Sequence, residues 1–208
     1  SHLKTNGSLP VNLKLLIEGE EEVGSMNLDP WVKANKERLK CDAVVISDSS
    51  MYDKGIPSIM YGLRGLAYFE VKVTGPSHDL HSGLFGGAVP NPINVLAEMI
   101  AKLHDEDGRI AIPGFYETVR DLTDDERAEF AALPFSEAAF LAETGAKGTR
   151  GEAGYTPIEQ TTARPTLDCN GIWGGFTGEG AKTVLPSYAC AKFSCRLVPP
   201  HPGTSLCL

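Results

Sequence analysis

The stretch GLAYFEVKVT, residues 65–74, decides the fold of most of this chain. Apolar residues occupy every second position, namely Ala67, Phe69, Val71 and Val73. The positions between them are of mixed character and comprise Leu66, Tyr68, Glu70 and Lys72. A period of two is typical of a half-buried strand in an antiparallel sheet. We therefore predict such a strand here and a domain boundary near Leu63, where the pattern begins.

Three further segments after this strand have clear periodicity. Residues 93–103 predict a helix, because one apolar stripe runs along them at helical spacing. The stripe consists of Val95, Leu96, Met99, Ile100 and Leu103. Residues 166–176 and 187–198 predict two strands, the second with clear polar and apolar alternation.

The region between that helix and those strands contains two capping signals. Thr123 and Glu126 have the spacing of a capping box, so a helix is expected to follow. Ser136 is placed to cap another short helix that ends near Gly145. Residues 147–164 are rich in Gly and Thr and are expected to form a loop.

The residues before Leu63 show a different pattern. VNLKLLI (residues 11–17) and DAVVIS (residues 42–47) are apolar runs of the kind that form buried parallel strands. A short helix between them is expected to begin at Asn27 or Asp29. The order strand, helix, strand predicts an α/β sheet for this part of the chain.

Composition excludes several classes of protein. The 208 residues include 19 Lys and Arg against 27 Asp and Glu, so the formal net charge is −8. This balance, without a long basic run, argues against nucleic acid and anionic membrane surfaces as partners. A hydrophobic content of 42% with 22% charged residues is typical of a globular protein and excludes general disorder.

The cysteines and the lack of long apolar runs indicate where in the cell the protein is expected to be. The five cysteines contain no CxxC pair, which argues against a disulfide framework or a thiolate zinc site and favours reduced, mostly buried thiols. No run approaches the roughly 18 apolar residues of a membrane span, and residues 1–10 lack the blocks of a signal peptide. We therefore expect a soluble, cytoplasmic protein.

Carboxylates follow both apolar runs of the first part. Glu20, Glu21 and Glu22 are consecutive, and Asp48 ends the second run. Adjacent anions repel and raise each other's pKa unless a cation neutralises them. A solvated acidic turn is the alternative for the glutamates alone. Since open α/β sheets gather ligands where their strands end, the two places together favour a metal site.

Several ordered motifs carry a resemblance to a known family. These are IEGEEEVGS (17–25), CDAVVISDSS (41–50), YGLRGLAYFEVKVTG (61–75), DLHSGLFGG (79–87), KTVLP (182–186) and FSCRLVP (193–199). Together they resemble the M20 family of metallopeptidases, and most closely its dipeptidase branch, which includes carnosinase-like and cytosolic nonspecific dipeptidases. The resemblance extends from about Leu9 to Pro199.

The resemblance assigns roles to the acidic residues. It implies that Glu21 is the general base, that Glu22 is a metal ligand and that Glu20 is a bystander. Asp48 resembles the carboxylate ligand of a second ion. Family members hold two divalent cations, usually zinc and sometimes manganese, and such a pair polarises the scissile carbonyl.

The resemblance also assigns roles in the second part of the chain. His81 resembles the histidine that reaches into the partner subunit's site and donates to the developing oxyanion. Thr183 and Arg196 resemble substrate-binding residues, and a guanidinium is suited to hold a peptide's terminal carboxylate. An ordinary ion pair would also explain Arg196, and strand propensity alone would explain Thr183.

The histidine motif leaves one alternative open and adds one expectation. His78 and His81 with Asp79 between them could form a metal site of their own on a helix or tight turn. A structural surface role is the other reading of His78. Three glycines, Gly83, Gly86 and Gly87, are expected to adopt positive φ and so to position the imidazole of His81.

Two family motifs are missing from this sequence. A His-x-Asp motif should precede Val11, and a final ligand histidine should lie well beyond Arg196, where residues 201–208 do not resemble the family. We therefore expect a segment of an M20 dipeptidase. Residues 1–62 would be an incomplete α/β strip of the metal-binding domain, and 199–208 an atypical tail. Residues 63–198 would be an α+β lid or dimerisation domain with a four-stranded antiparallel sheet.

The expected function belongs to the whole protein of which this chain would be part. That protein would be a homodimer, paired through its lids, that hydrolyses dipeptides or short C-terminal peptide bonds with metal-activated water. The chain alone, with an incomplete or absent metal site, would be inactive. A noncatalytic dimerisation and substrate-gating module is one alternative, and an N-acyl amino acid deacylase is another, because the same site cleaves either amide.

Overall fold

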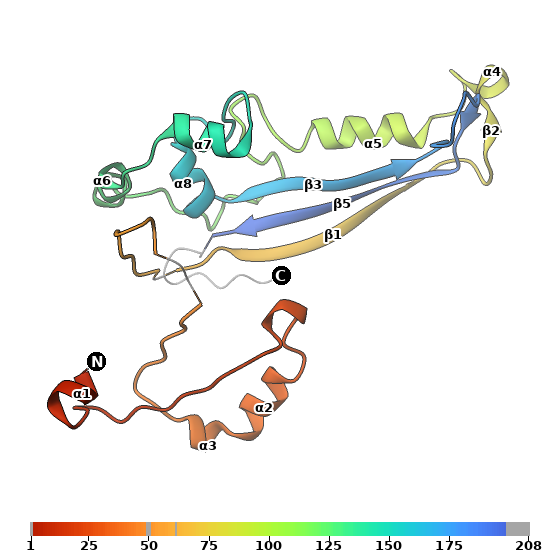
Figure 1. Cartoon of the computed structure of the whole chain (residues 1–208). Coiled ribbons are helices and arrows are strands. Elements are labelled where there is room, and N and C mark those ends of the chain that lie inside the picture. The colour runs from red at the N-terminus through yellow and green to blue at the C-terminus, as the bar shows by residue number, and fades with distance from the viewer. Residues whose placement is uncertain (1, 49–50, 61, 199–208) are drawn as a thin grey trace. The chain divides into compact units, whose positions relative to one another are not determined.

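The computed structural model describes residues 2–48, 51–60 and 62–198. The chain divides into two units, Ser1–Ile59 and Met60–Leu208 (Figure 1). The tail predicted at 199–208 lies outside the described residues. No helix in the described ranges is long and apolar enough to cross a membrane.

The second unit is built on a three-stranded antiparallel sheet. Its order is β1 (Gly65–Thr74), β5 (Tyr188–Leu197), β3 (Thr166–Gly174). All three strands were predicted from their periodicity and are confirmed. A separate pair of short strands, β2 (Leu80–His81) and β4 (Val184–Leu185), was not predicted, because two residues are too few to show a period.

The sheet has three strands in the described residues, whereas the resemblance implied four. Residues 62–198 contain only three long runs with a period of two, and each of them is used. The count of four is therefore wrong for this part of the chain. Both β1 and β3 are edges of the described sheet.

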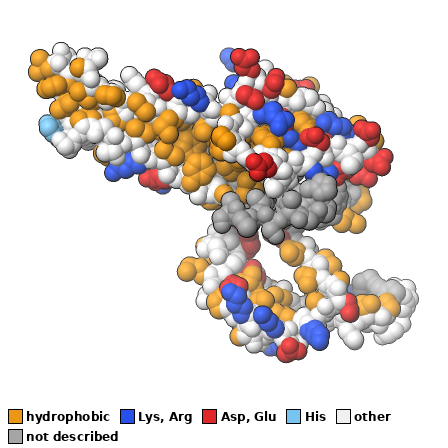
Figure 2. Space-filling view, turned by 180° about the vertical axis from the view of Figure 1, so that it is seen from behind, with side chains coloured by type: hydrophobic (Ala, Val, Ile, Leu, Met, Phe, Trp, Pro, Cys, Tyr) orange, Lys and Arg blue, Asp and Glu red, His pale blue; other side chains and the backbone are white. Residues whose placement is uncertain are grey.

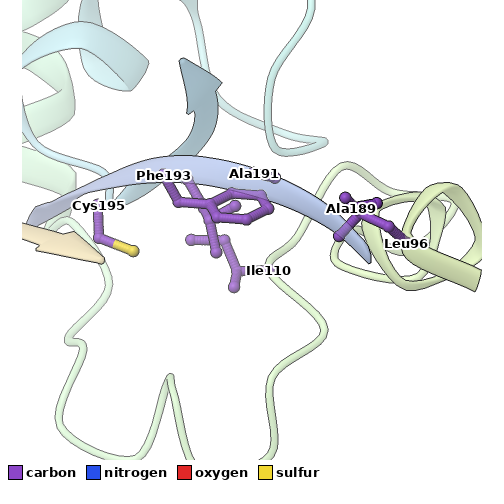
Figure 3. Close-up of a cluster of buried hydrophobic side chains, with 7 residues drawn as sticks. Leu96, Ile110, Ala189, Ala191, Phe193 and Cys195 are labelled. Carbon is purple, nitrogen blue, oxygen red and sulfur yellow. The ribbon is translucent and has the colours of Figure 1, made fainter. Parts of the chain in front are cut away.

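The core lies on one face of this sheet. Helix α5 (Pro92–Ala101) runs along one side of the sheet (Figure 1) and contacts β5 and β1. Its first turn is capped by Asn91, whose Oδ1 accepts from the amide of Ile93 at 2.9 Å. The buried cluster comprises Leu96, Ile110, Leu167, Ala189, Ala191, Phe193 and Cys195 (Figure 3). The predicted apolar face of β1 joins it, and Phe69 stacks on Phe193 with ring centroids 5.1 Å apart. The helix predicted at 93–103 is thus confirmed.

Two more predicted helices form where their caps lie. Helix α6 (Asp124–Ala132) begins with the capping box of Thr123 and Glu126, and α7 (Glu137–Thr144) begins after Ser136. The side chain of Arg120 and the amide of Thr123 lower the pKa of Glu126 to about 2. Because the folded pKa lies below the ordinary value, this cap loses its stabilising charge only as the pH falls through about 2.

One helix contradicts the prediction of a loop at 147–164. Helix α8 (Pro157–Thr162) begins with a second capping box, in which Thr156 and Glu159 bond each other's backbone amides. Proline at the first helical position completes the signal. The pattern Thr-Pro-Ile-Glu therefore predicts a helix start, and the glycines around it concealed that signal.

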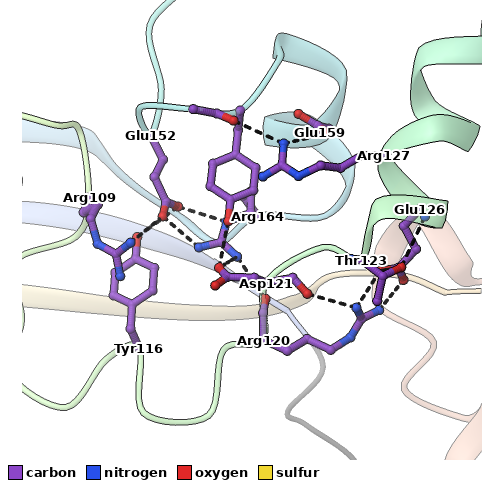
Figure 4. A network of polar contacts seen from close by, with 12 residues as sticks. Arg109, Tyr116, Arg120, Asp121, Thr123, Glu126, Arg127, Glu152, Glu159 and Arg164 are labelled. Carbon is purple, nitrogen blue, oxygen red and sulfur yellow. Dashed lines mark hydrogen bonds and ion pairs between the residues drawn. The ribbon is translucent and has the colours of Figure 1, made fainter.

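The segment around α8 is held by a buried ionic network (Figure 4). Glu152 is 4% exposed and Arg164 is 1% exposed. The Nη2 and Nε groups of Arg164 donate to the two carboxylate oxygens of Glu152 at 2.7 and 3.0 Å. Arg109 donates to the same carboxylate at 3.0 Å, and the Tyr116 hydroxyl at 3.4 Å. Every oxygen of the buried carboxylate is therefore satisfied.

Aromatic rings flank the guanidinium of Arg164. Its Cζ lies 4.3 Å from the ring centroid of Tyr155 and 5.8 Å from that of Tyr116. Burial opposes the charged form of Arg164, but the hydrogen bond and the charge of Glu152 outweigh it, so the pKa of Arg164 is raised. The bidentate, charge-assisted hydrogen bonds between Arg164 and Glu152 are among the strongest that side chains form.

Replacing Glu152 by Gln is expected to destabilise the second unit by about 3 kcal/mol, because the buried charge of Arg164 would keep only the exposed carboxylate of Asp121, 3.6 Å from its Nη1. Urea unfolding followed by circular dichroism measures this change. Asp29→Asn is the matched control, since Asp29 pairs with Lys33 at 2.6 Å on an exposed surface, and its loss should cost less than about 0.5 kcal/mol. Equal losses in the two variants would contradict this account.

The four described cysteines are free thiols. Cys190 and Cys195 are buried in β5, while Cys41 and Cys169 are exposed. The expectation that the thiols are mostly buried is wrong for half of those described. Burial, followed by the charge of Asp168, raises the pKa of Cys195, so this thiol is held in its unreactive form.

The first unit contains helices but no strand in its described part. It comprises α1 (His2–Asn6), the short 3-10 helix η1 (Glu21–Val23), α2 (Leu28–Ala34) and α3 (Lys36–Leu39). The helix predicted to begin at Asn27 or Asp29 is confirmed by α2.

The strands predicted at 11–17 and 42–47 are not formed, which is a correction. Their residues are exposed, with Ile17 at 90% and Val45 at 88%, and Figure 2 shows hydrophobic side chains interspersed with charged ones on the surface of this unit. A strand of a parallel sheet is stabilised by neighbours on both sides, and the described residues of this unit provide none. The apolar pattern is real, but its partners are missing from the described chain.

Backbone amides of 11–17 and 42–47 are expected to exchange with solvent within seconds at neutral pH, since no backbone hydrogen bond of the described residues protects them. Amides of β5, which is paired on both sides, should be protected by orders of magnitude more. Hydrogen exchange with mass spectrometry on the 208-residue chain measures both. Protection of 11–17 comparable to that of β5 would show a strand partner that this account lacks.

Candidate functional site

The acidic run lies in a tight turn formed by η1. Gly24 closes the turn with φ of 94°, in the left-handed region that favours glycine. The carboxylate of Glu20 accepts from the side-chain amide of Asn27 at 2.8 and 3.0 Å, so Glu20 holds the turn. Glu21 and Glu22 have no hydrogen-bond or ion-pair partner among the described residues, and both are exposed. Their carboxylates are therefore available to external groups.

Asp48 is also exposed, at the end of the second apolar run. Among the described residues, no three His, Cys, Asp or Glu side chains gather as ligands for one metal ion. A catalytic zinc ion takes three protein ligands and a water. Glu22 and Asp48 therefore do not complete a metal centre within the described chain, and their roles as ligands remain predictions.

The structure brings together two predicted site residues that are about a hundred positions apart. Strand β2 pairs with β4, with His81 opposite Val184. The imidazole Nε2 of His81 lies 3.1 Å from the hydroxyl oxygen of Thr183. Nδ1 of the same ring accepts from the amide of Gly83 at 3.0 Å. Because Nδ1 accepts, the neutral ring carries its proton on Nε2, which is then a donor.

A second contact ties the histidine loop to the start of β5. The amide of Ser187 donates to Oδ1 of Asp79 at 2.9 Å, and this bond is the main cause of the lowered pKa of Asp79. Among the residues that the structure describes, the one hydrogen bond of the His78 side chain is to the adjacent Ser77 hydroxyl, 3.0 Å from its Nδ1. The alternative of a metal site made by His78, Asp79 and His81 is therefore not formed. The sequence analysis missed the role of Asp79, since nothing local marks a partner so far along the chain.

The three glycines after His81 act in a different way from that predicted. Only Gly87 has positive φ, at 84°. Gly83 instead leaves space for the imidazole, because an added Cβ would lie 2.9 Å from Cε1 of His81. Gly86 lies close to the carbonyl of Ser82, 2.4 Å from where its Cβ would be. Positive φ at all three positions is thus wrong, and close approach explains two of them.

Arg196 lies at the other end of the sheet from this loop. It is opposite Leu66 on β1 and Thr166 on β3, whereas the loop adjoins the end where Thr74 pairs with Tyr188. Eight residues of extended strand between Tyr188 and Arg196 span roughly 26 Å. The guanidinium is exposed and has no hydrogen-bond or ion-pair partner among the described residues, so the alternative of a strand-end ion pair is not formed there.

Replacing Gly83 by Ala is expected to displace the His81 ring while leaving stability within about 1 kcal/mol, because the clash is with a movable side chain. Nitrogen-15 NMR of the ring checks this, since loss of the bond to the Gly83 amide would mix the two neutral tautomers. Gly148→Ala is the control, because an added Cβ there meets nothing within 4 Å. An unchanged tautomer in Gly83→Ala would refute this role.

Comparison with known proteins identifies the family to which the second unit is similar. Residues 61–206 match the family profile described as the peptidase dimerisation domain of M20 peptidases. The chain is 38% identical over 201 residues to the Cys-Gly metallodipeptidase DUG1 of Candida albicans, which covers 96% of this chain and 41% of that protein. It is 36% identical over 193 residues to the human Beta-Ala-His dipeptidase, covering 92% of this chain and 38% of that protein.

Solved structures show the same similarity. The M20 family metallo-carboxypeptidase Sso-CP2 from Sulfolobus solfataricus superposes with a TM-score of 0.77 at 38% identity, over 96% of this chain and 46% of that one. Human carnosine dipeptidase 1 gives 0.71 at 36% identity, over 89% of this chain and 39% of that one.

The fold and these matches define the second unit as a peptidase dimerisation domain with its α+β architecture. The chain belongs to the M20 family of peptidases, as the sequence motifs predicted, and its relatives lie in the carnosinase-like branch. It spans about two fifths of the length of the curated relatives it matches.

Proposed function

We propose that the protein containing this chain is a metal-dependent M20 peptidase that hydrolyses dipeptides or short C-terminal peptide bonds. Residues 1–62 would supply part of its metal-binding domain and residues 63–198 its lid. The observation that carries the proposal is the placement of His81 beside Thr183 on an M20 dimerisation domain. The relatives named as dipeptidases support the choice of substrate.

The acidic residues divide between two tasks in this proposal. Glu21 takes a proton from the attacking water as general base. Glu22 and Asp48 each supply one carboxylate to divalent cations, zinc or manganese, which polarise a scissile carbonyl when bound. The other ligands that such ions need are not among the described residues.

His81 stabilises the charge that develops on the substrate oxygen. Its Nε2–H is the donor of the neutral ring, and in the absence of substrate this group is hydrogen-bonded to the hydroxyl of Thr183. A preorganised donor aimed at a developing oxyanion is among the largest contributions to catalysis. Asp79 and Gly83 fix the loop and the ring that carry this donor.

The length of the sheet supports a site shared between two copies. Arg196, the proposed anchor of the terminal carboxylate, lies roughly 26 Å along β5 from the His81 loop. A dipeptide is too short to contact both within one copy. In a two-fold dimer, His81 and Thr183 of one copy can complete the site that contains Arg196 of the other. We therefore propose that this peptidase is a homodimer through the lid.

Two alternatives are distinguished by specific observations. A noncatalytic dimerisation and gating module would explain why the described residues complete no metal centre. An N-acyl amino acid deacylase would use the same carboxylate anchor on a different amide.

A cytoplasmic location is part of our proposal, since the described cysteines are all free thiols.

The full protein that contains this chain is expected to hydrolyse Cys-Gly and β-Ala-His, and to lose this activity when EDTA removes divalent metal. Glu21→Gln should lower kcat by about 10² to 10⁴, and His81→Ala by about 10². Acetylated amino acids cleaved faster than dipeptides would favour the deacylase. Activity that survives both EDTA and Glu21→Gln would refute the metal-dependent mechanism.

Mixing the two inactive variants tests the shared site. In a mixed dimer the His81→Ala copy keeps Glu21 and receives His81 from the Glu21→Gln copy, so one site of two is complete. Statistical exchange then restores about a quarter of wild-type activity. No recovery after verified exchange would show that His81 acts within its own copy. The 208-residue chain alone, given zinc or manganese, is expected to be inactive.

A further inference from the structure

Arg64 lies beside Arg196 at one end of the sheet. It comes one residue before β1, and Leu66, two positions on, is opposite Arg196. Arg64 and Arg196 both line one cleft of about 750 Å³, which also includes Ile100 and Ala101 of α5. Two guanidiniums are thus gathered at this sheet end.

Arg64 is held in place by backbone carbonyls. Its Nη1 donates to the carbonyl oxygens of Gln160 and Arg164, each at 3.2 Å, just inside and beyond the end of α8. A cation at a helix C-terminus is favourable. The described residues offer no hydrogen-bond partner to its Nε and Nη2 groups, nor to any group of Arg196. Three N–H donors of Arg64 and all five of Arg196 therefore have no acceptor among the described residues.

The charges at this end are not balanced. Burial and then the neighbouring Arg196 lower the pKa of Arg64, while Asp168 opposes them. Arg150 and His104 line the same cleft, and its other acid, Glu152, is engaged by Arg164. Two adjacent cations repel each other unless an anion lies between them.

We propose that Arg64 and Arg196 form one oxyanion subsite, in which each guanidinium donates to one oxygen of a carboxylate. Arg196 alone could hold a carboxylate but is free to move, whereas Arg64 is fixed by α8 and determines where the carboxylate lies. On the proposed function above, this ligand is the C-terminal carboxylate of the peptide substrate. The existence of the anion subsite does not depend on that function.

The 208-residue chain tests the subsite directly by NMR of the arginine Nε–H groups, assigned with Arg→Lys variants. N-acetylglycine, which carries a carboxylate, is expected to shift the signals of both Arg64 and Arg196, and N-acetylglycinamide is expected to shift neither. Arg64→Lys, which keeps the charge but not the fork, should raise the dissociation constant measured at Arg196 by about tenfold. Arg150→Lys, in the same cleft, should leave it unchanged.

Three outcomes would overturn the inference: a stationary Arg64 signal, equal effects of the amide and the acid, or an Arg64→Lys dissociation constant equal to that of the wild type. In the full protein, Arg64→Lys should raise KM for dipeptides several-fold with kcat nearly unchanged, which loss of structure would not produce. Absence of dipeptidase activity in the wild type would refute the proposed function, while the NMR result would still decide the subsite.

Discussion

The buried pair of Glu152 and Arg164 is the constraint on which the second unit depends. Moving these two charges out of water costs several kcal/mol per ion, and only the bidentate geometry and the added donors of Arg109 and Tyr116 offset it. The pair fixes the residues after α7 against those after α8, and the bond from Arg109 adds the residues after α5. The backbone carbonyl of Arg164 is in turn an acceptor for Arg64. Arg164 therefore links the buried ion pair to Arg64 at the charged end of the sheet.

The long strand β5 transmits this order but also separates the candidate functional groups. One of its ends adjoins the loop that carries His81, and the other carries Arg196. Antiparallel pairing on both sides makes β5 stiff, so the two ends cannot approach each other within one copy. A site that uses both therefore requires a second copy, which agrees with the match to a dimerisation domain.

Features that depend on local sequence were predicted well. The period of two in β1 and the caps at Thr123 and Ser136 act within a few residues, and their elements form as expected. The pairing of Glu152 with Arg164 could not be predicted from local sequence, because only the fold brings the two side chains together. Helix α8 was missed although its capping box is local, since glycine content was given more weight than the cap. The motifs identified candidate site residues, but not which of them meet.

The two halves of the candidate site differ because their supporting strands differ. His81 and Thr183 meet because β2 and β4 pair with each other, and both belong to the described chain. Glu22 and Asp48 follow apolar runs whose strand partners the described chain does not provide. Carboxylates can converge on a metal only when their strands are registered in one sheet. His81 and Thr183 are therefore preorganised in this chain. For Glu22 and Asp48 to be ordered, other strands must pair with residues 11–17 and 42–47.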